Sequence, residues 1–270
     1  MGSERIVITR DGAVAHVEMA RPDKLNAMDG DFFGELGDAF RSLGSDAGVR
    51  GILLSGQGRH FSAGLDLGWA AEQFAPSRDP GRWSEKQHRD IRALQAAVNA
   101  VEDARPPVVA AVHGGCIGGA VDLACACDLR VASADAWFQV AEIDVAITAD
   151  LGTLQRLPHL IPGGIARELA LTGRKMPADE AARWGFVNRV TADRDAAIAA
   201  GLELAGMIAA KSPMAAAGTK ASLNHSRGRP IADGMAHVAL WNAATLANGD
   251  LHAISSAKAK GVPPTFPDLD

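Results

Sequence analysis

The sequence predicts an α/β fold followed by an all-helical C-terminal part. Segments typical of strands and helices alternate from residue 5 to about residue 190, which indicates helices packed on a sheet. From about residue 194 to residue 261 the chain is rich in alanine, has helical spacing and contains no strand signal. The third observation is size, because 270 residues with 47% hydrophobic content can bury roughly three quarters of the unfolded surface.

The elements of the α/β part follow in order along the chain. Two alternating runs around Asp11 and Gly12 predict a β-hairpin at 6–20. The expected helices are at 30–46 and 84–104, and the expected strands are at 48–58 and 108–114. The C-terminal helices have long apolar faces, which need a partner to cover them.

Charge and the two ends of the sequence exclude several classes of function. The net charge of −5 argues against a nucleic-acid partner, which usually binds clustered Lys and Arg. No apolar run reaches the length of a membrane span, so we expect no membrane association. The opening MGSERIVITR has no leader character, and the ending TFPDLD is not a peroxisomal address. These features predict a cytoplasmic protein.

Three cysteines lie close together in one apolar stretch, at Cys116, Cys125 and Cys127. Their spacing matches neither a zinc site nor a disulfide framework. We therefore expect buried, reduced thiols and no metal site.

Two glycine-bearing segments, at 58–67 and 113–128, each follow a predicted strand. Glycines at a strand end let the backbone turn sharply and direct N–H groups into a cleft; the alternative is ordinary turn chemistry. Neither segment contains G-x-G-x-x-G or a Walker loop, and the chain has no G-x-S-x-G or H-E-x-x-H motif. Nucleotide cradles of these types, serine acyl transfer and zinc hydrolysis are therefore disfavoured.

Asp122, Glu142 and Asp150 stand out because small or apolar residues surround them. An uncompensated buried charge costs several kcal/mol or is neutralised, so these carboxylates indicate acid–base chemistry. Two structural alternatives stay open: Asp122 can interact with a helix dipole, and Asp150 can N-cap the next helix. Asp144 is expected to be a surface carboxylate.

Five segments carry a family resemblance. In order they are RPDKLNAMD, FSAGLDL, HGGCIGGAVDLACACDLR, FQVAEIDVAITADLGTLQRLP and LTGRKMPADEAARWGFVNRV. Together they resemble the enoyl-CoA hydratase/isomerase family, the crotonases, over nearly the whole chain. Within it the sequence is most similar to the Δ3,5-Δ2,4-dienoyl-CoA isomerases, because Asp122, Glu142 and Asp150 fall on the three acidic positions of their pattern.

The resemblance implies a fold and an assembly. A crotonase-like spiral core of ββα turns would occupy residues 1–195 and hold the CoA and acyl site. Residues 196–270 would form a helical region for contacts in a homo-oligomer, a trimer or a dimer of trimers. The implied partner is an acyl-CoA thioester, and no cofactor is expected, because coenzyme A is part of the substrate.

The resemblance also implies binding residues. The backbone N–H groups of Leu65 and Gly119 would form the oxyanion hole for the thioester oxygen. The residues expected to line the CoA and substrate site are Arg21, Lys24, Leu25, Ala27, Ser62, Ala63, Gly64, Asp66, Leu67 and Gly118.

The implied reaction converts 3,5-dienoyl-CoA into 2,4-dienoyl-CoA in fatty-acid β-oxidation. Glu142 would be the base at C2, Asp150 the acid at C6, and Asp122 would tune Glu142 or its hydrogen bonds. The main alternative is an enoyl-CoA hydratase, with Asp122 and Glu142 holding one water. A Δ3-Δ2 enoyl isomerase leaves two acids unexplained, and a crotonase-fold binding protein without activity is the non-enzymatic alternative.

Overall fold

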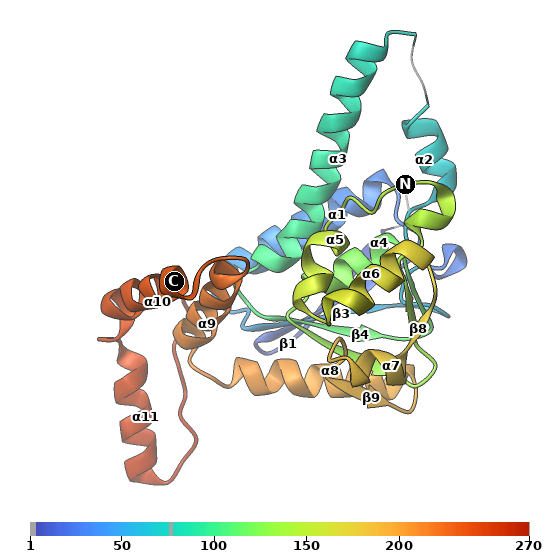
Figure 1. Cartoon of the computed structure of the whole chain (residues 1–270). Helices are drawn as coiled ribbons and strands as arrows, with labels where there is room; N and C mark the ends of the chain where they lie inside the picture. Colours follow the sequence, from blue (N-terminus) through green and yellow to red (C-terminus); the bar gives the residue numbers. More distant parts are fainter. Residues whose placement is uncertain (1–3, 76–77, 270) are drawn as a thin grey trace.

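The structure is a computed structural model that describes residues 4–75 and 78–269, and its body is a sheet with helices on both faces (Figure 1). The strands of the large sheet are β1 (Ile6–Asp11), β2 (Val14–Met19), β3 (Gly51–Gly56), β4 (Val108–Val112), β6 (Leu129–Ser133) and β9 (Arg189–Thr191). They lie in the order β1-β2-β3-β4-β6-β9. β1 and β2 form an antiparallel hairpin, and the other neighbours run parallel. The predicted α/β class and the hairpin are confirmed.

A second, smaller sheet stacks beside the first and positions two loops of interest. Its strands are β5 (Gly115–Ile117), β7 (Trp137–Gln139) and β8 (Met176–Pro177), in the order β5-β7-β8. The chain passes from β4 directly into β5 and from β6 into β7, so successive turns of the chain stack on one another. β5 and β7 are parallel, with Ile117 opposite Gln139, and the loops that follow these two strands therefore lie side by side.

Helices cover the large sheet on two sides. The helices of the body are α1 (Gly30–Ser45), α2 (Leu67–Gln73), α3 (Pro80–Asp103), α4 (Gly119–Ala126), α5 (Thr153–Arg156), α6 (Gly163–Thr172), α7 (Ala178–Arg183) and α8 (Arg194–Ala209), with 3₁₀ helices η1 (Pro22–Lys24), η2 (Glu142–Val145) and η3 (Leu157–His159). On β3, Ile52 and Leu54 pack into the core that includes α1 and α3, whereas Leu53 packs under α8. Because both faces of this strand are covered, it is apolar without alternation.

The helix boundaries follow from capping. α1 lies within the expected range, and the Asp29 carboxylate accepts a hydrogen bond from Phe32 N–H at its start. α3 begins at Pro80, earlier than the expected residue 84, because the Asp79 side chain caps it and proline suits the first helical turn. The periodicity of apolar residues did not reveal this cap.

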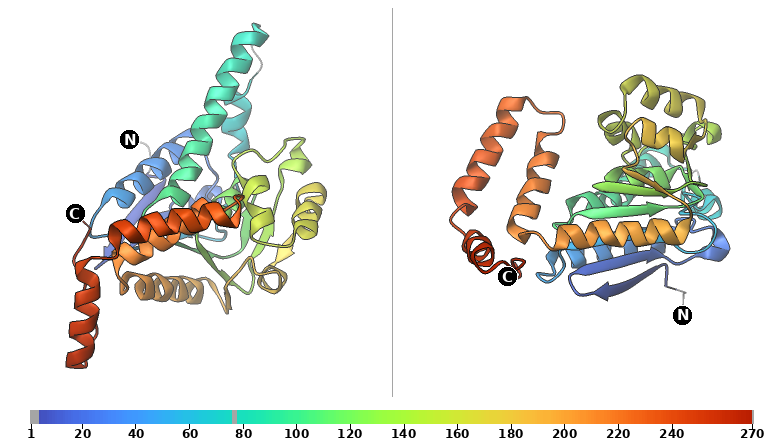
Figure 2. Two further views of the ribbon diagram at one scale, coloured as in Figure 1. Left: turned by 60° about the vertical axis from the view of Figure 1, so that its left-hand side comes forward. Right: turned by 90° about the horizontal axis from the view of Figure 1, so that it is seen from below.

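The last three helices extend away from the body (Figure 2). They are α9 (Pro213–Ser226), α10 (Ile231–Thr245) and α11 (Gly249–Lys260). α8, which falls almost wholly within 196–270, packs instead on the strands of the large sheet. Among the described helices, none combines the length and the apolar character that a membrane crossing needs. The role of the C-terminal helices in subunit contacts stays a prediction.

The three cysteines are buried and unpaired. Burial raises the pKa of Cys125 and of Cys127 to about 12. Such thiols stay protonated near neutral pH and are poor nucleophiles. The expectation of buried, reduced thiols is confirmed.

Candidate active site

The two glycine-bearing loops touch at Gly64. Gly64 has a φ of +81°, and a Cβ on it would lie 2.4 Å from the Ile117 carbonyl oxygen and 3.3 Å from the Gly119 nitrogen. Glycine permits this approach, so the residue before Leu65 packs against the backbone at the start of α4. Among the described residues, neither the Leu65 N–H nor the Gly119 N–H donates to a protein acceptor. Two free donors directed at one oxygen can stabilise negative charge on it.

The loops at 21–28 and 62–66 run side by side and frame this point. Ala63 N–H donates to the Leu25 carbonyl at 2.9 Å, and Met28 N–H donates to the Gly64 carbonyl at 2.8 Å. These bonds fix the backbone path that leads into Leu65. The predicted CoA-binding segments are therefore brought together.

Asn26 organises these loops and was missing from the predicted site residues. It is fully buried and has a left-handed φ of 55°, a conformation that asparagine tolerates better than most residues. Its Nδ2 donates to the carbonyl oxygens of Gln57, His60 and Phe61 at 2.8, 3.0 and 3.1 Å. The signal in the sequence was an asparagine inside a turn-rich motif, but its acceptors lie more than 30 residues away.

Several predicted CoA-binding side chains hold the loops instead of facing outward. Arg21 pairs with Asp29 at 3.1 Å and with Asp66 at 3.4 Å. The Ser62 hydroxyl is buried, donates to the Asn26 carbonyl at 2.8 Å and accepts from the Gly64 N–H at 3.1 Å. Asp66 also caps α2. The polar groups of these side chains are occupied within the protein.

The remaining residues predicted to bind CoA differ in how exposed they are. Lys24, Leu25 and Leu67 are exposed beside the loops, and Ala27 and Ala63 are half-buried. A Cβ on Gly118 would lie 3.3 Å from Glu142 Oε1, so this glycine makes room for the carboxylate. The structure thus leaves Lys24 as the exposed cation of the predicted set.

Asp122 is the most deeply buried of the three carboxylates. It lies in the first turn of α4 and is 1% exposed. Its Oδ1 accepts a hydrogen bond from Thr153 N–H at 2.5 Å, and its Oδ2 is buried without a partner among the described residues. Burial raises the pKa of Asp122 to about 7; hydrogen bonding from Thr153 opposes this, and the nearby charge of Glu142 adds to it.

Glu142 begins η2, directly after the small-sheet strand β7. Its Oε2 is buried and has no hydrogen-bond partner within the described residues. Burial raises its pKa, and the charge of Asp150 acts in the same direction. A carboxylate with a raised pKa is a stronger base than an ordinary glutamate.

Asp150 completes the group but lies nearer the surface. It is exposed in the single chain, yet the protein around the carboxyl group still raises its pKa by desolvation. Its charge acts on both Asp122 and Glu142, so the three carboxylates are close enough to couple electrostatically. The chain turns between Glu142 and Asp150, as their convergence requires.

The N-cap alternative for Asp150 is wrong. α5 starts at Thr153, its N-cap is Gly152, and no side chain within that segment caps it. The Thr153 N–H is instead satisfied by Asp122, which comes from α4. Sequence spacing could not reveal this, because the capping carboxylate is 31 residues away. Asp144 is exposed, as expected.

A polar cavity of about 400 Å³ lies beside Asp150. Its lining includes Asp150, Gly152, Gln155 and Arg156 from one segment, and a polar face of α3 from another. Gln95 on α3 donates from Nε2 to the Asp150 carbonyl oxygen at 2.6 Å. Gln95 and Arg156 were not predicted as site residues.

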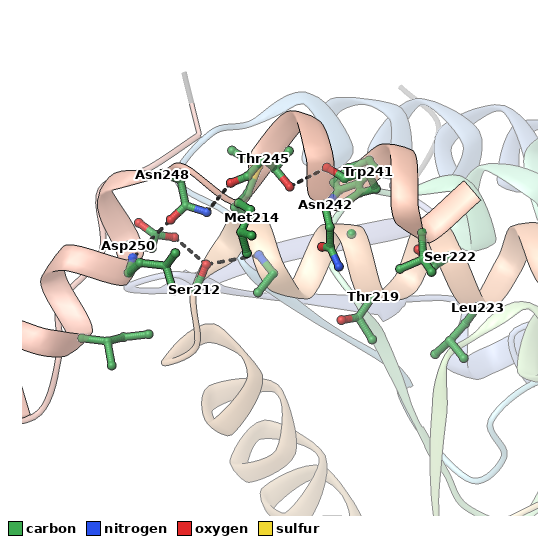
Figure 3. Close-up of a pocket in the computed structure, with 16 residues that line it drawn as sticks. Ser212, Met214, Thr219, Ser222, Leu223, Trp241, Asn242, Thr245, Asn248 and Asp250 are labelled. Carbon is green, nitrogen blue, oxygen red and sulfur yellow. Dashed lines mark hydrogen bonds between the residues drawn. The ribbon is translucent and has the colours of Figure 1, made fainter. Parts of the chain in front are cut away.

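Another cavity, of about 410 Å³, lies between α9, α10 and α11, outside the carboxylate group (Figure 3). The Ser212 hydroxyl donates to Asp250 Oδ2 at 2.5 Å and thereby links α9 to α11. Apolar side chains such as Leu223 and Leu251 line the same space. It contains none of the three candidate catalytic carboxylates.

The chain is similar to a known family and to named proteins within it. A model of the enoyl-CoA hydratase/isomerase family matches residues 9–242. A peroxisomal Delta(3,5)-Delta(2,4)-dienoyl-CoA isomerase from Arabidopsis thaliana is 44% identical over 96% of this chain and 94% of its own length. A mitochondrial protein of the same name from Homo sapiens is 44% identical over 88% of this chain and 74% of its own length.

Solved structures support the fold. An enoyl-CoA hydratase from Bacillus anthracis superposes with a TM-score of 0.89 at 26% identity, covering 98% of this chain and 99% of its own. An enoyl-CoA hydratase from Mycobacterium tuberculosis H37Rv gives a TM-score of 0.85 at 29% identity, with the same coverage of both chains. The expected crotonase-like fold is therefore confirmed.

The same comparisons correct the predicted compartment. The relatives from Arabidopsis thaliana and Homo sapiens are named peroxisomal and mitochondrial, so the prediction of a cytoplasmic protein is wrong. The prediction rested on the absence of recognisable addresses at the two ends. The residues that build the fold and the site carry no information about the compartment.

Proposed function

Because the chain belongs to the enoyl-CoA hydratase/isomerase family, we propose that it converts 3,5-dienoyl-CoA into 2,4-dienoyl-CoA in fatty-acid β-oxidation. One observation carries the proposal: three carboxylates that interact electrostatically have raised pKa values, and Glu142 lies against Gly118, next to the unpaired backbone N–H of Gly119. A reaction that removes a proton at one carbon and returns one four carbons away needs such a set. The reaction needs no cofactor.

The first half of the reaction uses Glu142 and the backbone donors. Glu142 takes a proton from C2, and the electron pair moves through the thioester carbonyl, so that negative charge collects on the oxygen. The N–H groups of Leu65 and Gly119 stabilise that charge. Losing one such donor typically costs about 10² to 10³ in rate.

The second half uses Asp150. As the carbonyl re-forms, electrons return along the conjugated chain, the double bonds shift from positions 3 and 5 to 2 and 4, and C6 takes a proton from Asp150. The raised pKa of Asp150 favours its protonated form at the start. The proton that Glu142 gained leaves to solvent or to the carboxylate network, in which Asp122 has a pKa of about 7.

A hydratase is the second candidate, and a specific observation favours it. Asp122 Oδ2 and Glu142 Oε2 are both buried without partners in the described part of the chain, and two such oxygens can hold one water. Hydration of a 2-enoyl thioester gives Asp150 no role, however. The relatives named dienoyl-CoA isomerase also share more identity with this chain than the solved hydratases above.

The helices α9–α11 support an oligomer. In the single chain, large apolar side chains of this helical region are exposed to solvent. The exposed fractions are 62% to 83% for Leu223, Ile231, Met235, Leu240 and Leu246. Patches of this kind mark protein contacts. The assembly we propose is a trimer or a dimer of trimers in which a second copy covers these helices.

The decisive measurement follows the conjugated 2,4-diene absorbance after purified protein is mixed with 3,5-dienoyl-CoA. The native chain should isomerise it, and Asp150→Asn should lose isomerisation by about 10² or more, the typical contribution of a general acid, while any hydratase activity on 2-enoyl-CoA remains. Asp144→Asn is the matched control, because Asp144 is an exposed carboxylate in the same segment. Normal isomerisation by Asp150→Asn would remove Asp150 from the mechanism.

A further inference from the structure

Hydrogen bonds from α3, from Asp122 on α4 and from Arg156 in α5 hold the segment that carries Asp150. The Asp150 carbonyl accepts from Gln95 at 2.6 Å, and the Leu151 carbonyl accepts from Arg156 Nη1 at 3.4 Å. Gly152 has a φ of +128°, and a Cβ on it would lie 1.8 Å from Arg156 Nη1. Thr153 N–H donates to Asp122 at 2.5 Å. The backbone from Asp150 to Thr153 is thus tied to α3 at one end and to Asp122 at the other.

One polar face of α3 supplies most of this support. Arg92, Gln95, Asn99 and Glu102 lie three, four and three residues apart, a spacing that places them on one side of a helix. All four line the cavity beside Asp150. Asn99 Oδ1 accepts from Arg156 Nη2 at 2.7 Å, and Glu102 Oε2 accepts from the same nitrogen at 2.5 Å.

The orientation of the Gln95 amide is itself determined. Its oxygen accepts from Arg92 Nη1 at 3.0 Å, so its nitrogen faces the Asp150 carbonyl. The bond is made to the backbone and not to the Asp150 carboxyl group. A change at Gln95 therefore alters where the carboxyl stands without removing it.

We propose that Gln95 is a positioning residue that sets the distance between Asp150 and C6 of the acyl chain. The inference rests on the proposed function. It adds that Gln95 affects proton return at C6 and does not affect proton removal at C2. β7 and the glycine loops hold Glu142, Leu65 and Gly119. In the described structure, Gln95 makes no hydrogen bond to these elements. Loss of Gln95 should impair the second proton transfer and leave the first intact.

The test is Gln95→Met in the 270-residue chain; this substitution keeps the side-chain length and removes the donor. We expect kcat for 3,5-dienoyl-CoA isomerisation to fall about 10- to 100-fold, as for a misplacement of about 1 Å, with KM changed less than about twofold, because the CoA contacts are untouched. The reaction is also run in D₂O and stopped before it is complete. The 3,5-dienoyl-CoA recovered from the variant should carry more deuterium at C2 than that recovered from the native enzyme, because deprotonation at C2 continues while protonation at C6 slows. The alkaline limb of the kcat–pH profile should move to lower pH as Asp150 gains water.

The matched control is Gln155→Met, because Gln155 lines the same cavity but is exposed, and its side chain makes no hydrogen bond in the described structure. It should keep native kcat, deuterium content and pH profile. Native kcat in Gln95→Met would overturn the positioning role while the proposed function stands. Loss of isomerisation and C2 exchange together would also overturn it, because the whole site would then be affected. A native enzyme that leaves 3,5-dienoyl-CoA unchanged would contradict the proposed function itself.

Discussion

At the scale of single residues, the site is made by taking carboxyl groups out of water. Asp122 shows this most clearly, since it is 1% exposed and accepts one hydrogen bond, from the Thr153 backbone. The protein tolerates the group because its pKa rises to about 7, so that it is largely protonated below neutral pH. Burying a carboxyl group in this way lowers the stability of the fold, and such groups with shifted pKa values are common at sites of acid–base chemistry.

This burial predicts a pH-dependent stability difference between Asp122→Asn and the native protein. The folded pKa of about 7 lies above the unfolded value of 3.8, so the native state binds more protons in between, and native stability falls as pH rises from about 4 to about 7. Asn can still accept from Thr153 N–H but never ionises. The variant should therefore gain stability relative to the native protein by a few kcal/mol between pH 4 and pH 8, because one pKa unit is about 1.4 kcal/mol.

Urea unfolding of both proteins at several pH values measures this difference. Asp144→Asn serves as the control, because it removes a carboxylate that is exposed instead of buried. A difference between Asp122→Asn and the native chain that stays constant from pH 4 to pH 8 would show that Asp122 does not titrate in this range.

The sequence indicated these residues but not their partners. Asp122, Glu142 and Asp150 were recognisable because charged residues are unusual in apolar stretches. Their mutual arrangement depends on the register of β5 against β7 and on Thr153 meeting α4, both long-range contacts. Asn26 escaped notice because its role lies in three carbonyl acceptors that only the folded chain brings to it.

At the scale of elements, α3 and α5 are joined by a buried ion pair. Glu102 and Arg156 side chains are 16% and 9% exposed and meet at 2.5 Å. Burial alone would raise the pKa of Glu102, but Arg156 and Arg227 hold it below its usual value. A helix was expected at 84–104 and is present from Pro80 to Asp103, yet nothing in its periodicity identified Glu102 as the residue that fixes α5.

Removing Glu102 should therefore be costly. Glu102→Gln leaves the Arg156 guanidinium buried without a counter-charge, which typically lowers the free energy of unfolding by about 3 to 5 kcal/mol. Glu85→Gln is the matched control on the same helix, because Glu85 and Arg89 are both 66% exposed and such surface pairs contribute about 0 to 1 kcal/mol. Thermal or urea unfolding compares the two; equal losses would mean that the buried pair does not brace α5.

At the scale of the whole molecule, the body and the C-terminal helices differ in how they are covered. α8 closes one face of the large sheet through Ala197, Ala200 and Ala205. α9 is tied to the body at its buried Lys220, whose Nζ meets Asp128 at 2.8 Å and the Pro106 carbonyl at 3.2 Å. The change of composition near residue 194 predicted the helical part, but composition could not separate the helix that serves the sheet from those that extend outward (Figure 2).

The uncovered helices lead to the last prediction, which concerns assembly. Leu240 and Met235 on α10 are 74% and 66% exposed in the single chain, and burying such side chains contributes about 1.5 to 3 kcal/mol each. The native protein should therefore sediment as a trimer or hexamer, and Leu240→Glu should shift it toward monomers, because a charge would have to enter an apolar interface. Analytical ultracentrifugation across micromolar concentrations measures this. Leu171→Glu is the control: Leu171 is also 71% exposed, but it lies on α6 of the body and not on the C-terminal helices proposed to form the contact, so this variant should leave the trimer intact. A native protein that sediments as a monomer at these concentrations would show that the C-terminal helices need no second copy to cover them.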